Sequence, residues 1–270
     1  MYCIHRPAPP LASSVEMFWY GEGYDASHRT ERALPNGRFQ LIIDLSDGFM
    51  RDGEPSAPRY QPAAAPLVVG MQSRFAVLET AALQHIMSVV LWPGGTHGLF
   101  DVPADAFYNG VVPLEQVWGA DADRLRDQLR ETPGAAGKFR VLETALLRRR
   151  IERLELHGAV RYGLRRFQCA PHIHSVLDVS KETGLSRRRF AQLFREQVGT
   201  TPKLYCRIHR FQRIVQRIAC GAPVDWVEVA LAGGYCDQAH LANEFRDFSG
   251  ITPGAYLASD RPFVNHVVID

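Results

Sequence analysis

Two short stretches in the second half of the sequence place arginine and carboxamide side chains together on one side of a helix. At about 100° per residue, these faces consist of Arg188, Gln192 and Arg195 in the first stretch and Ala239, Asn243 and Arg246 in the second. Such side chains can read DNA base edges, because Arg matches guanine, Gln and Asn match adenine, and Ala can touch the thymine methyl group. A single face of this kind is more often only solvated, but two in a repeated unit favour base recognition.

Both faces lie in two copies of one helical unit, which together span residues 175–256. Val179 and Gly184 of the first copy correspond to Val229 and Gly234 of the second, at an offset of 50 residues. After the turn the offset becomes 51, so the second copy holds one extra residue. A repeat of this kind indicates a supersecondary unit that is used twice.

The signals within each copy predict a helix, a turn and a second helix, followed by a third helix. A short oxygen-bearing side chain with an acid three residues later marks a helix start. Glycine marks a helix end, and proline opens a helix where its missing amide costs nothing. In the order of the copies, the predicted N-caps are Ser175 and Asp225, the turn glycines Gly184 and Gly234, and the opening prolines Pro202 and Pro253. The helices after the turns are the predicted recognition helices.

One uninterrupted helix is predicted to join the two copies, from Pro202 to Gly221. Its apolar residues have the spacing of a buried stripe, which consists of Tyr205, Ile208, Phe211, Ile214, Val215 and Ile218. At about 1.5 Å per residue this helix is roughly 27 to 30 Å long. Successive major-groove faces of a duplex lie about 34 Å apart. We therefore expect the rod to hold the two recognition helices in adjacent grooves of one asymmetric site.

Residues 159–258 resemble the DNA-binding domain of AraC-family transcriptional regulators. The motifs that carry the resemblance are GLSRRRFAQLFREQVGTTPKLY, RIHRFQRIVQRIACG and VALAGGYCDQAHLANEFRDFSGITPGAY. The resemblance implies two helix-turn-helix subdomains joined by a long helix. It also implies base contacts by Arg188, Ala191 and Gln192 in the first recognition helix and by Ala239, His240 and Asn243 in the second. The residues expected to contact DNA are Arg187, Arg188, Arg189, Gln192, Arg195, Lys203, Gln238, Ala239, His240, Asn243 and Arg246.

The charge of the chain is divided unequally between its halves. Residues 1–137 hold 10 Lys/Arg against 16 Asp/Glu, a formal charge of −6, whereas residues 138–270 hold 21 against 13, a charge of +8. Nine basic residues and one acid, Glu196, fall between residues 184 and 220. A basic concentration of this kind is the electrostatic pattern expected for phosphate contact.

The first hundred residues predict strands. β-branched and aromatic residues are concentrated at 15–20, 38–46, 67–70, 73–79 and 84–92, and turn signals separate these runs. The expected fold class is α+β, with a β-rich barrel or sandwich followed by an all-α double helix-turn-helix domain. The expected domains are residues 1–157, for ligand sensing or dimerisation, and residues 158–270, for DNA binding. A proline-rich loop is predicted at residues 51–66.

The N-terminal half carries a second resemblance, to the corresponding half of a subgroup of AraC-type regulators. It rests on HRPAPPLASSVEMFWY, LPNGRFQLIIDLSDG and LWPGG, and it implies a domain that senses a ligand or dimerises. Aromatic side chains are abundant in these strands, and the candidates for ligand contact are Trp19, Tyr20, Phe39 and Trp92. Core packing explains the same aromatics equally well.

The sequence gives little support to an enzyme or to a metal site. The candidate metal ligands are His28, His85, His97, His172, His174, Cys236 and His240, and none of them forms a complete ligand pattern. No phosphate-binding glycine loop or nucleophile elbow is present. We expect no enzyme activity, no catalytic residue, no metal and no cofactor. The alternative is a barrel enzyme or metal-binding domain fused to a DNA-binding module.

The expected partners are double-stranded DNA and a small-molecule effector of unknown identity. RNA polymerase and a second copy of the chain are further partners that this interpretation leaves open. The five cysteines are scattered, and neither a signal segment nor an apolar run of about 18 residues is found. We therefore expect a cytoplasmic protein with no membrane partner.

Overall fold

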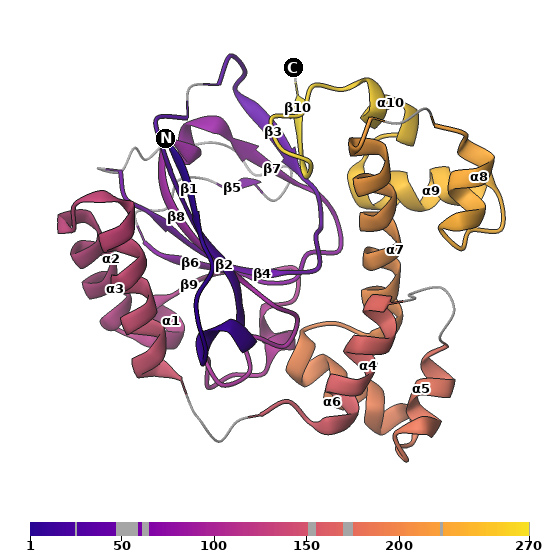
Figure 1. The fold of residues 1–270 in the computed structure, drawn as a ribbon, viewed down its shortest axis with the longest axis horizontal. Helices are drawn as coiled ribbons and strands as arrows, with labels where there is room; N and C mark the ends of the chain where they lie inside the picture. The colour runs from indigo at the N-terminus through magenta and orange to yellow at the C-terminus, as the bar shows by residue number, and fades with distance from the viewer. Residues whose placement is uncertain are drawn as a thin grey trace.

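The computed structural model describes residues 1–24, 26–46, 59–60, 65–150, 155–169, 175–221 and 224–269. Its N-terminal part is rich in strands and its C-terminal part is helical, and the C-terminal end returns to the strands (Figure 1). The predicted α+β class is therefore confirmed. The loop predicted at residues 51–66 lies largely outside the described residues. In the part of the chain that is described, no helix combines the length and the hydropathy that crossing a membrane requires.

The larger sheet is antiparallel and forms the centre of the N-terminal part. Its strands follow the order β1 (Tyr2–His5), β2 (Val15–Glu22), β8 (His85–Leu91), β4 (Phe39–Asp44), β6 (Leu67–Val69) and β9 (Val111–Pro113). β-branched and aromatic residues dominate these strands, because they pack well on a pleated surface. The five strand regions predicted from the sequence correspond to β2, β4, β6, β8 and, in the second sheet, β7.

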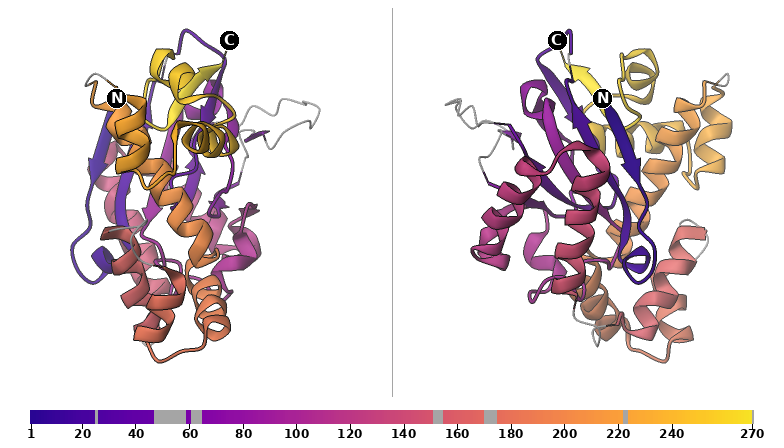
Figure 2. Two further views of the ribbon diagram at one scale, coloured as in Figure 1. Left: turned by 90° about the vertical axis from the view of Figure 1, so that its right-hand side faces the viewer. Right: turned by 60° about the vertical axis from the view of Figure 1, so that its left-hand side comes forward.

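Helices cover one face of the larger sheet (Figure 2). They are α1 (Glu115–Trp118), α2 (Asp121–Glu131) and α3 (Gly134–Arg149). Phe139 of α3 stacks on His5 of β1 with ring centroids 5.3 Å apart, and its centroid lies 6.3 Å from that of Phe18 in β2. This face of the sheet is therefore filled by packing between strands and helices.

The second sheet contains a strand from the C-terminal end of the chain. Its order is β10 (His266–Ile269), β3 (Thr30–Ala33), β7 (Ala76–Glu79) and β5 (Arg59–Tyr60). β10 pairs antiparallel with β3, with Val267 opposite Arg32. The sequence did not lead us to predict β1, β3, β5, β9 or β10. Of these, β10 matters most, because it ties the end of the chain to the N-terminal part.

The C-terminal helices form two similar units at the ends of one long helix (Figure 1). They are α4 (Gly158–Cys169), α5 (Val176–Glu182), α6 (Arg187–Val198), α7 (Pro202–Ala219), α8 (Trp226–Ala232), α9 (Gln238–Ser249) and α10 (Pro253–Ala258). The predicted caps are confirmed, since the side chains of Ser175 and Asp225 accept from the amides of Asp178 and Glu228 respectively. Gly184 and Gly234 have φ of 71° and 76°, the left-handed conformation that the two turns need.

Helix α7 is the rod predicted between the copies, and all six residues of its predicted apolar stripe are buried. The repeat is visible in how the two units pack against it. The rings of Phe194 and Tyr205 lie 5.5 Å apart in the first unit, and those of Phe245 and Tyr256 lie 5.6 Å apart in the second. These pairs are equivalent in the repeat. The duplicated sequence therefore specifies a duplicated core.

A buried carboxylate fixes α9 on α7. Glu244 of α9 is 5% exposed and accepts hydrogen bonds from Arg207 Nε at 2.8 Å and from Arg210 Nη2 at 3.1 Å. Both arginines belong to α7. Because a buried charge needs charged or hydrogen-bonding partners, α9 is held at a defined place along α7.

The other side of α7 touches the N-terminal part at the turn of residues 34–38. Gln212 Nε2 donates to the carbonyl of Pro35 at 2.8 Å, and a side chain added at Gly37 would meet Ile208 at 3.4 Å and His209 at 3.8 Å. At Gly199, just before α7 in the chain, the Cβ of any replacing residue would lie 2.5 Å from the Phe39 ring. The helical and β-rich parts are thus in close contact.

We predict that Glu244→Ala lowers the free energy of unfolding by about 2 to 4 kcal/mol, because it leaves two partly buried arginines without their common partner. Asp247→Ala is the matched control. Asp247 lies one turn along α9, is 70% exposed and is 3.6 Å from Arg207, so its loss should cost less than about 1 kcal/mol. Urea unfolding followed by circular dichroism measures both. Equal losses in the two variants would contradict the role assigned to Glu244.

A second prediction concerns pH and the contact between α7 and the turn at residues 34–38. Burial, together with the positive charges of Arg38 and Arg213, lowers the pKa of His209 from 6.5 to about 4. In the unfolded chain His209 is protonated as pH falls below about 6.5, whereas in the folded chain it is protonated only near pH 4. The free energy of unfolding that is present above pH 6.5 is therefore partly lost as pH falls from 6.5 to 4. We expect the free energy of unfolding of His209→Phe to fall less between pH 7 and pH 5 than that of the unchanged protein. Parallel curves for the two proteins would refute this prediction.

Candidate nucleic-acid interface

The candidate interface is formed by the second helix of each helix-turn-helix unit, α6 and α9. Their N-caps are Ser186 and Asp237, whose side chains accept from the amides of Arg189 and His240. In α6 the apolar side chains Phe190, Leu193, Phe194 and Val198 are buried, and in α9 Leu241, Phe245 and Phe248 are buried. The opposite face of each helix is exposed for most of its length.

The structure places every residue predicted to contact DNA on the exposed surface. This set consists of Arg187, Arg188, Arg189, Gln192, Arg195, Lys203, Gln238, Ala239, His240, Asn243 and Arg246. Ala191, which the resemblance also implicates, is half-buried. Exposure is what base contact requires, while contact itself stays a prediction.

Local contacts orient some of these side chains. Gln192 Nε2 donates to Glu196 Oε1 at 2.8 Å on α6. On α9, Nδ1 of His240 accepts from the amide of Cys236 at 3.4 Å, and the His240 ring meets the Tyr235 ring edge-on at 5.2 Å. Cys236 and His240, considered above as metal ligands, are thus joined by a hydrogen bond from the Cys236 amide to the His240 ring.

Part of the basic concentration between residues 184 and 220 makes contacts within the protein. Arg207 and Arg210 bind Glu244, Arg217 lies 2.7 Å from Glu228, and Arg213 donates to the carbonyl of Cys169. These four arginines of α7 are therefore partly committed to internal contacts, while phosphate contact by the basic residues of this stretch stays a prediction. The basic residues of α6 and Lys203 remain as the positive surface beside the predicted base contacts.

The N-terminal part approaches the outer face of α6. Asp105, in the 3-10 turn Ala104–Phe107, lines one small hollow together with Arg188, Gln192 and Arg195. A carboxylate thus sits near the positive side chains of the first recognition helix.

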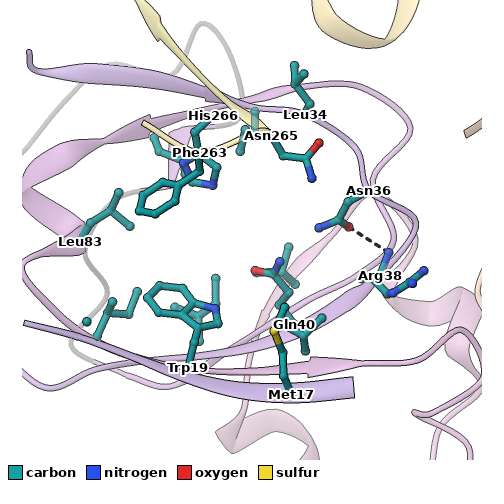
Figure 3. A pocket seen from close by; sticks show the side chains of 18 of the residues that line it. Met17, Trp19, Leu34, Asn36, Arg38, Gln40, Leu83, Phe263, Asn265 and His266 are labelled. Carbon is teal, nitrogen blue, oxygen red and sulfur yellow. Dashed lines mark hydrogen bonds between the residues drawn. The ribbon is translucent and has the colours of Figure 1, made fainter. Parts of the chain in front are cut away.

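A cavity of about 760 Å³ lies between the two sheets of the N-terminal part (Figure 3). Strand alternation decides which predicted ligand residues reach it, because neighbouring residues of a strand point to opposite faces. Trp19 lines the cavity, whereas Tyr20 is on the opposite face of β2, where Lys138 lies over its ring at 5.9 Å. Phe39 likewise points away, and its ring centroid is 6.2 Å from that of Phe107.

The ligand predictions for Tyr20, Phe39 and Trp92 are thus not supported by the cavity. Trp92 is not among its lining residues, and Arg38 lies over the Trp92 ring at 5.0 Å. The cavity instead includes residues that the sequence did not suggest, among them Gln40, Phe263 and Asn265. For Gln40 a signal existed, since a carboxamide interrupts the apolar run of β4.

The histidines considered as metal ligands have other contacts. His28 lies 2.7 Å from Glu31, and His85 lies 3.0 Å from the Tyr20 hydroxyl. Burial lowers the pKa of His97. His172 and His174 lie outside the described residues. Within the described ranges, no group of three or more His, Cys, Asp or Glu residues is arranged to hold a metal ion.

Comparisons with known proteins concern both halves of the chain. Residues 179–259 match a family described as a helix-turn-helix domain, and residues 4–113 match a domain of unknown function (DUF6597). A search of curated proteins finds no match.

Among solved structures, ToxT from Vibrio cholerae is similar over 95% of this chain and 97% of its own, at 11% identity and a TM-score of 0.42. The C-terminal domain of AraT, a response regulator from Geobacillus stearothermophilus, covers 38% of this chain and 86% of its own, at 16% identity and a TM-score of 0.36. A DNA-binding transcriptional dual regulator from Escherichia coli K-12 covers 37% and 96%, at 20% identity and a TM-score of 0.33.

The helix-turn-helix match begins within α5 and ends just after α10, so it includes both units and the rod between them. The exposed polar faces of α6 and α9 occupy equivalent places in the two units. The chain therefore carries an AraC-type helix-turn-helix domain in its C-terminal part and a distinct β-rich domain in front of it.

Proposed function

We propose that this regulator recognises one asymmetric DNA sequence with α6 and α9 and that a small molecule bound between its two sheets controls this recognition. The observation that carries the proposal is the pair of equivalent exposed faces held on one rod, α7. In this proposal residues 1–157 sense the effector and residues 158–270 bind DNA.

The proposed interface has residues for contact with bases and a residue for contact with phosphate. Arg188 and Gln192 on α6, and Asn243 on α9, are exposed and have the donor and acceptor groups that match purine edges in the major groove. Lys203 follows the N-cap Thr201 of α7 and is also exposed. A lysine at this place suits a phosphate, since its point charge carries no base preference.

The cavity supports control by an effector. Its volume of about 760 Å³ falls in the usual range of small-molecule sites, about 300 to 1,000 Å³. Its wall includes Gln212 and Gln216 of α7 as well as strands of both sheets. A bound molecule would therefore touch the rod that carries both recognition helices, which gives occupancy a physical route to DNA binding. Contact with RNA polymerase and pairing with a second copy remain open proposals.

The first test separates base contact from phosphate contact in the full-length protein. We expect Arg188→Ala and Asn243→Ala each to cost about 1 to 3 kcal/mol on a duplex selected from a random pool, and to relax preference at one base position. Lys203→Ala should weaken selected and random duplexes similarly and lower the salt dependence of binding. Fluorescence anisotropy measures the affinities. Equal losses for Arg188→Ala on both duplexes would contradict its base contact.

The second test concerns the spacing that α7 imposes. Inserting about five base pairs between the two sub-sites moves one of them to the opposite side of the duplex. A rigid rod cannot follow, so we expect affinity to fall to that of one sub-site, and an insertion of about ten base pairs to lose contact through distance. Footprinting on the selected site reports which sub-site is lost. Undiminished protection of both sub-sites after the half-turn insertion would refute rigid spacing by α7.

A further inference from the structure

The C-terminal segment of residues 260–269 forms part of the wall of the cavity between the sheets. Phe263, Val264, Asn265 and His266 all line the cavity, opposite the strands of the larger sheet. The cavity is therefore closed by residues that follow the second helix-turn-helix unit in the chain, although it lies in the N-terminal part.

We propose that this cavity is a site for a flat, uncharged and mainly apolar molecule with a hydrogen-bonding group at one end, and that the molecule fixes the C-terminal segment against the N-terminal sheets. The inference rests on the effector control proposed above and names the class of effector and the element that responds to it.

One end of the cavity is aromatic. The rings of Trp19 in β2 and Phe263 in the C-terminal segment face each other across it (Figure 3). Tyr2 bridges them at the edge, with its ring centroid 5.8 Å from each of the other two. Phe263 is 39% exposed, which is high for a large aromatic side chain in a wall. A flat apolar molecule between these rings would gain stacking on both sides and bury the exposed ring surface.

The other end of the cavity carries side-chain amides. Asn36, Gln40 and Asn265 lie together there (Figure 3). The Asn36 oxygen accepts from the amide of Arg38 at 2.9 Å, and the Asn265 oxygen accepts from Gln212 Nε2 at 2.9 Å. Their NH2 groups are thus left as donors, and the side-chain amide of Gln40 has no hydrogen-bonding partner among the described residues. A carbonyl or hydroxyl group of a ligand would match these amides.

Among the described residues, the basic side chains of the wall already have carboxylate partners, which disfavours a carboxylate ligand. Arg38 is ion-paired with Glu16, and His266 is paired with Glu31 at 2.7 Å. An anion entering the cavity would therefore compete with Glu16 and Glu31 for these two side chains, and burying an uncompensated charge is costly. Glu22 and Asp44, also on the wall, accept hydrogen bonds from Tyr20 and Ser46.

A buried carboxylate anchors the C-terminal segment to the N-terminal part. Glu31 of β3 is fully buried and accepts hydrogen bonds from His266 at 2.7 Å, His28 at 2.7 Å and Tyr24 at 2.6 Å. Burial alone would raise the pKa of Glu31, but these hydrogen bonds outweigh it and lower the pKa to about 2. The carboxylate thus remains ionised, and the segment is docked by a charged contact in addition to the β10–β3 pairing.

The same segment is tied to the second helix-turn-helix unit. The Tyr256 hydroxyl of α10 donates to the carbonyl of Val264 at 2.6 Å, and Gln212 of α7 donates to Asn265. A ligand held by Phe263 and Asn265 therefore stabilises the contact of α7 and α10 with the N-terminal part. Occupancy of the cavity is in this way linked to the position of the second recognition unit.

The experiment uses the full-length protein and three probes that share one ring system. They are 2-naphthamide, which is uncharged, 2-naphthoate, which is an anion, and 2-naphthylmethylammonium, which is a cation. We expect 2-naphthamide to bind at least about tenfold more tightly than either charged probe, as measured by calorimetry. Tighter binding of either charged probe would overturn the ligand class, and so would the absence of binding by all three at about 1 mM.

Variants locate the bound probe. Phe263→Ala should weaken 2-naphthamide at least about tenfold, and Gln40→Leu should weaken it while leaving naphthalene itself unaffected. Phe263 is partly exposed, so its truncation should leave the fold intact, and circular dichroism checks this. Tyr108→Ala, an equally exposed aromatic at 39% outside the cavity lining, is the matched control and should bind as the unchanged protein does. Unchanged affinity of Phe263→Ala would overturn the proposed site.

Hydrogen exchange tests the response of the C-terminal segment. Saturating 2-naphthamide should slow exchange in peptides covering residues 260–269 at least about tenfold, because a ligand that binds only the docked segment stabilises it. Binding without any change in this segment would overturn the link to the second unit. If the probes do not bind but Arg188→Ala weakens binding to the selected duplex as expected, this inference alone is rejected. If Arg188→Ala does not have the expected effect on DNA binding, the proposed function itself is rejected.

Discussion

Helix α7 is the constraint on which the rest of the molecule depends. Its apolar residues are buried in the cores of both helix-turn-helix units, Arg207 and Arg210 hold α9 through Glu244, and Gln212 reaches the turn before β4. A helix that is buried on several sides cannot rotate or slide without breaking all of these contacts together. Helices α6 and α9 and the N-terminal sheets are therefore positioned relative to one rigid element.

The two halves of the chain solve the problem of buried charge in the same way. Glu244 in the helical half and Glu31 in the β-rich half each take hydrogen bonds from side chains of another element. In both places the ionised oxygen fixes an element that shape alone would leave adjustable, α9 in one case and β10 in the other. A hydrophobic core sets how closely the elements approach, and these charged contacts set their register.

The helical half was predictable because its signals are local and occur twice. The caps Ser175 and Asp225, the turn glycines and the stripe of α7 each act within a few residues, and duplication made them recognisable. β10 was missed because HVVI is short and its partner β3 lies more than 200 residues earlier, a separation that no local pattern encodes. Strand alternation could have placed Trp19 and Tyr20 on opposite faces of β2. Which face borders a cavity depends on the second sheet, and that sheet is completed by β10.

The pairing of β10 with β3 also shapes how the chain can fold during synthesis. Residues 1–118 supply nearly all the strands, yet β3 keeps an unpaired edge until residues 266–269 have left the ribosome. Such an edge is a template for pairing with other chains, and N-terminal segments generally begin to fold before synthesis ends. During synthesis the second sheet therefore lacks its edge strand β10 while both helix-turn-helix units are translated. Pairing with β10 therefore follows the synthesis of both helix-turn-helix units, and chains that stall before residue 266 would expose an edge of β3 that this pairing covers.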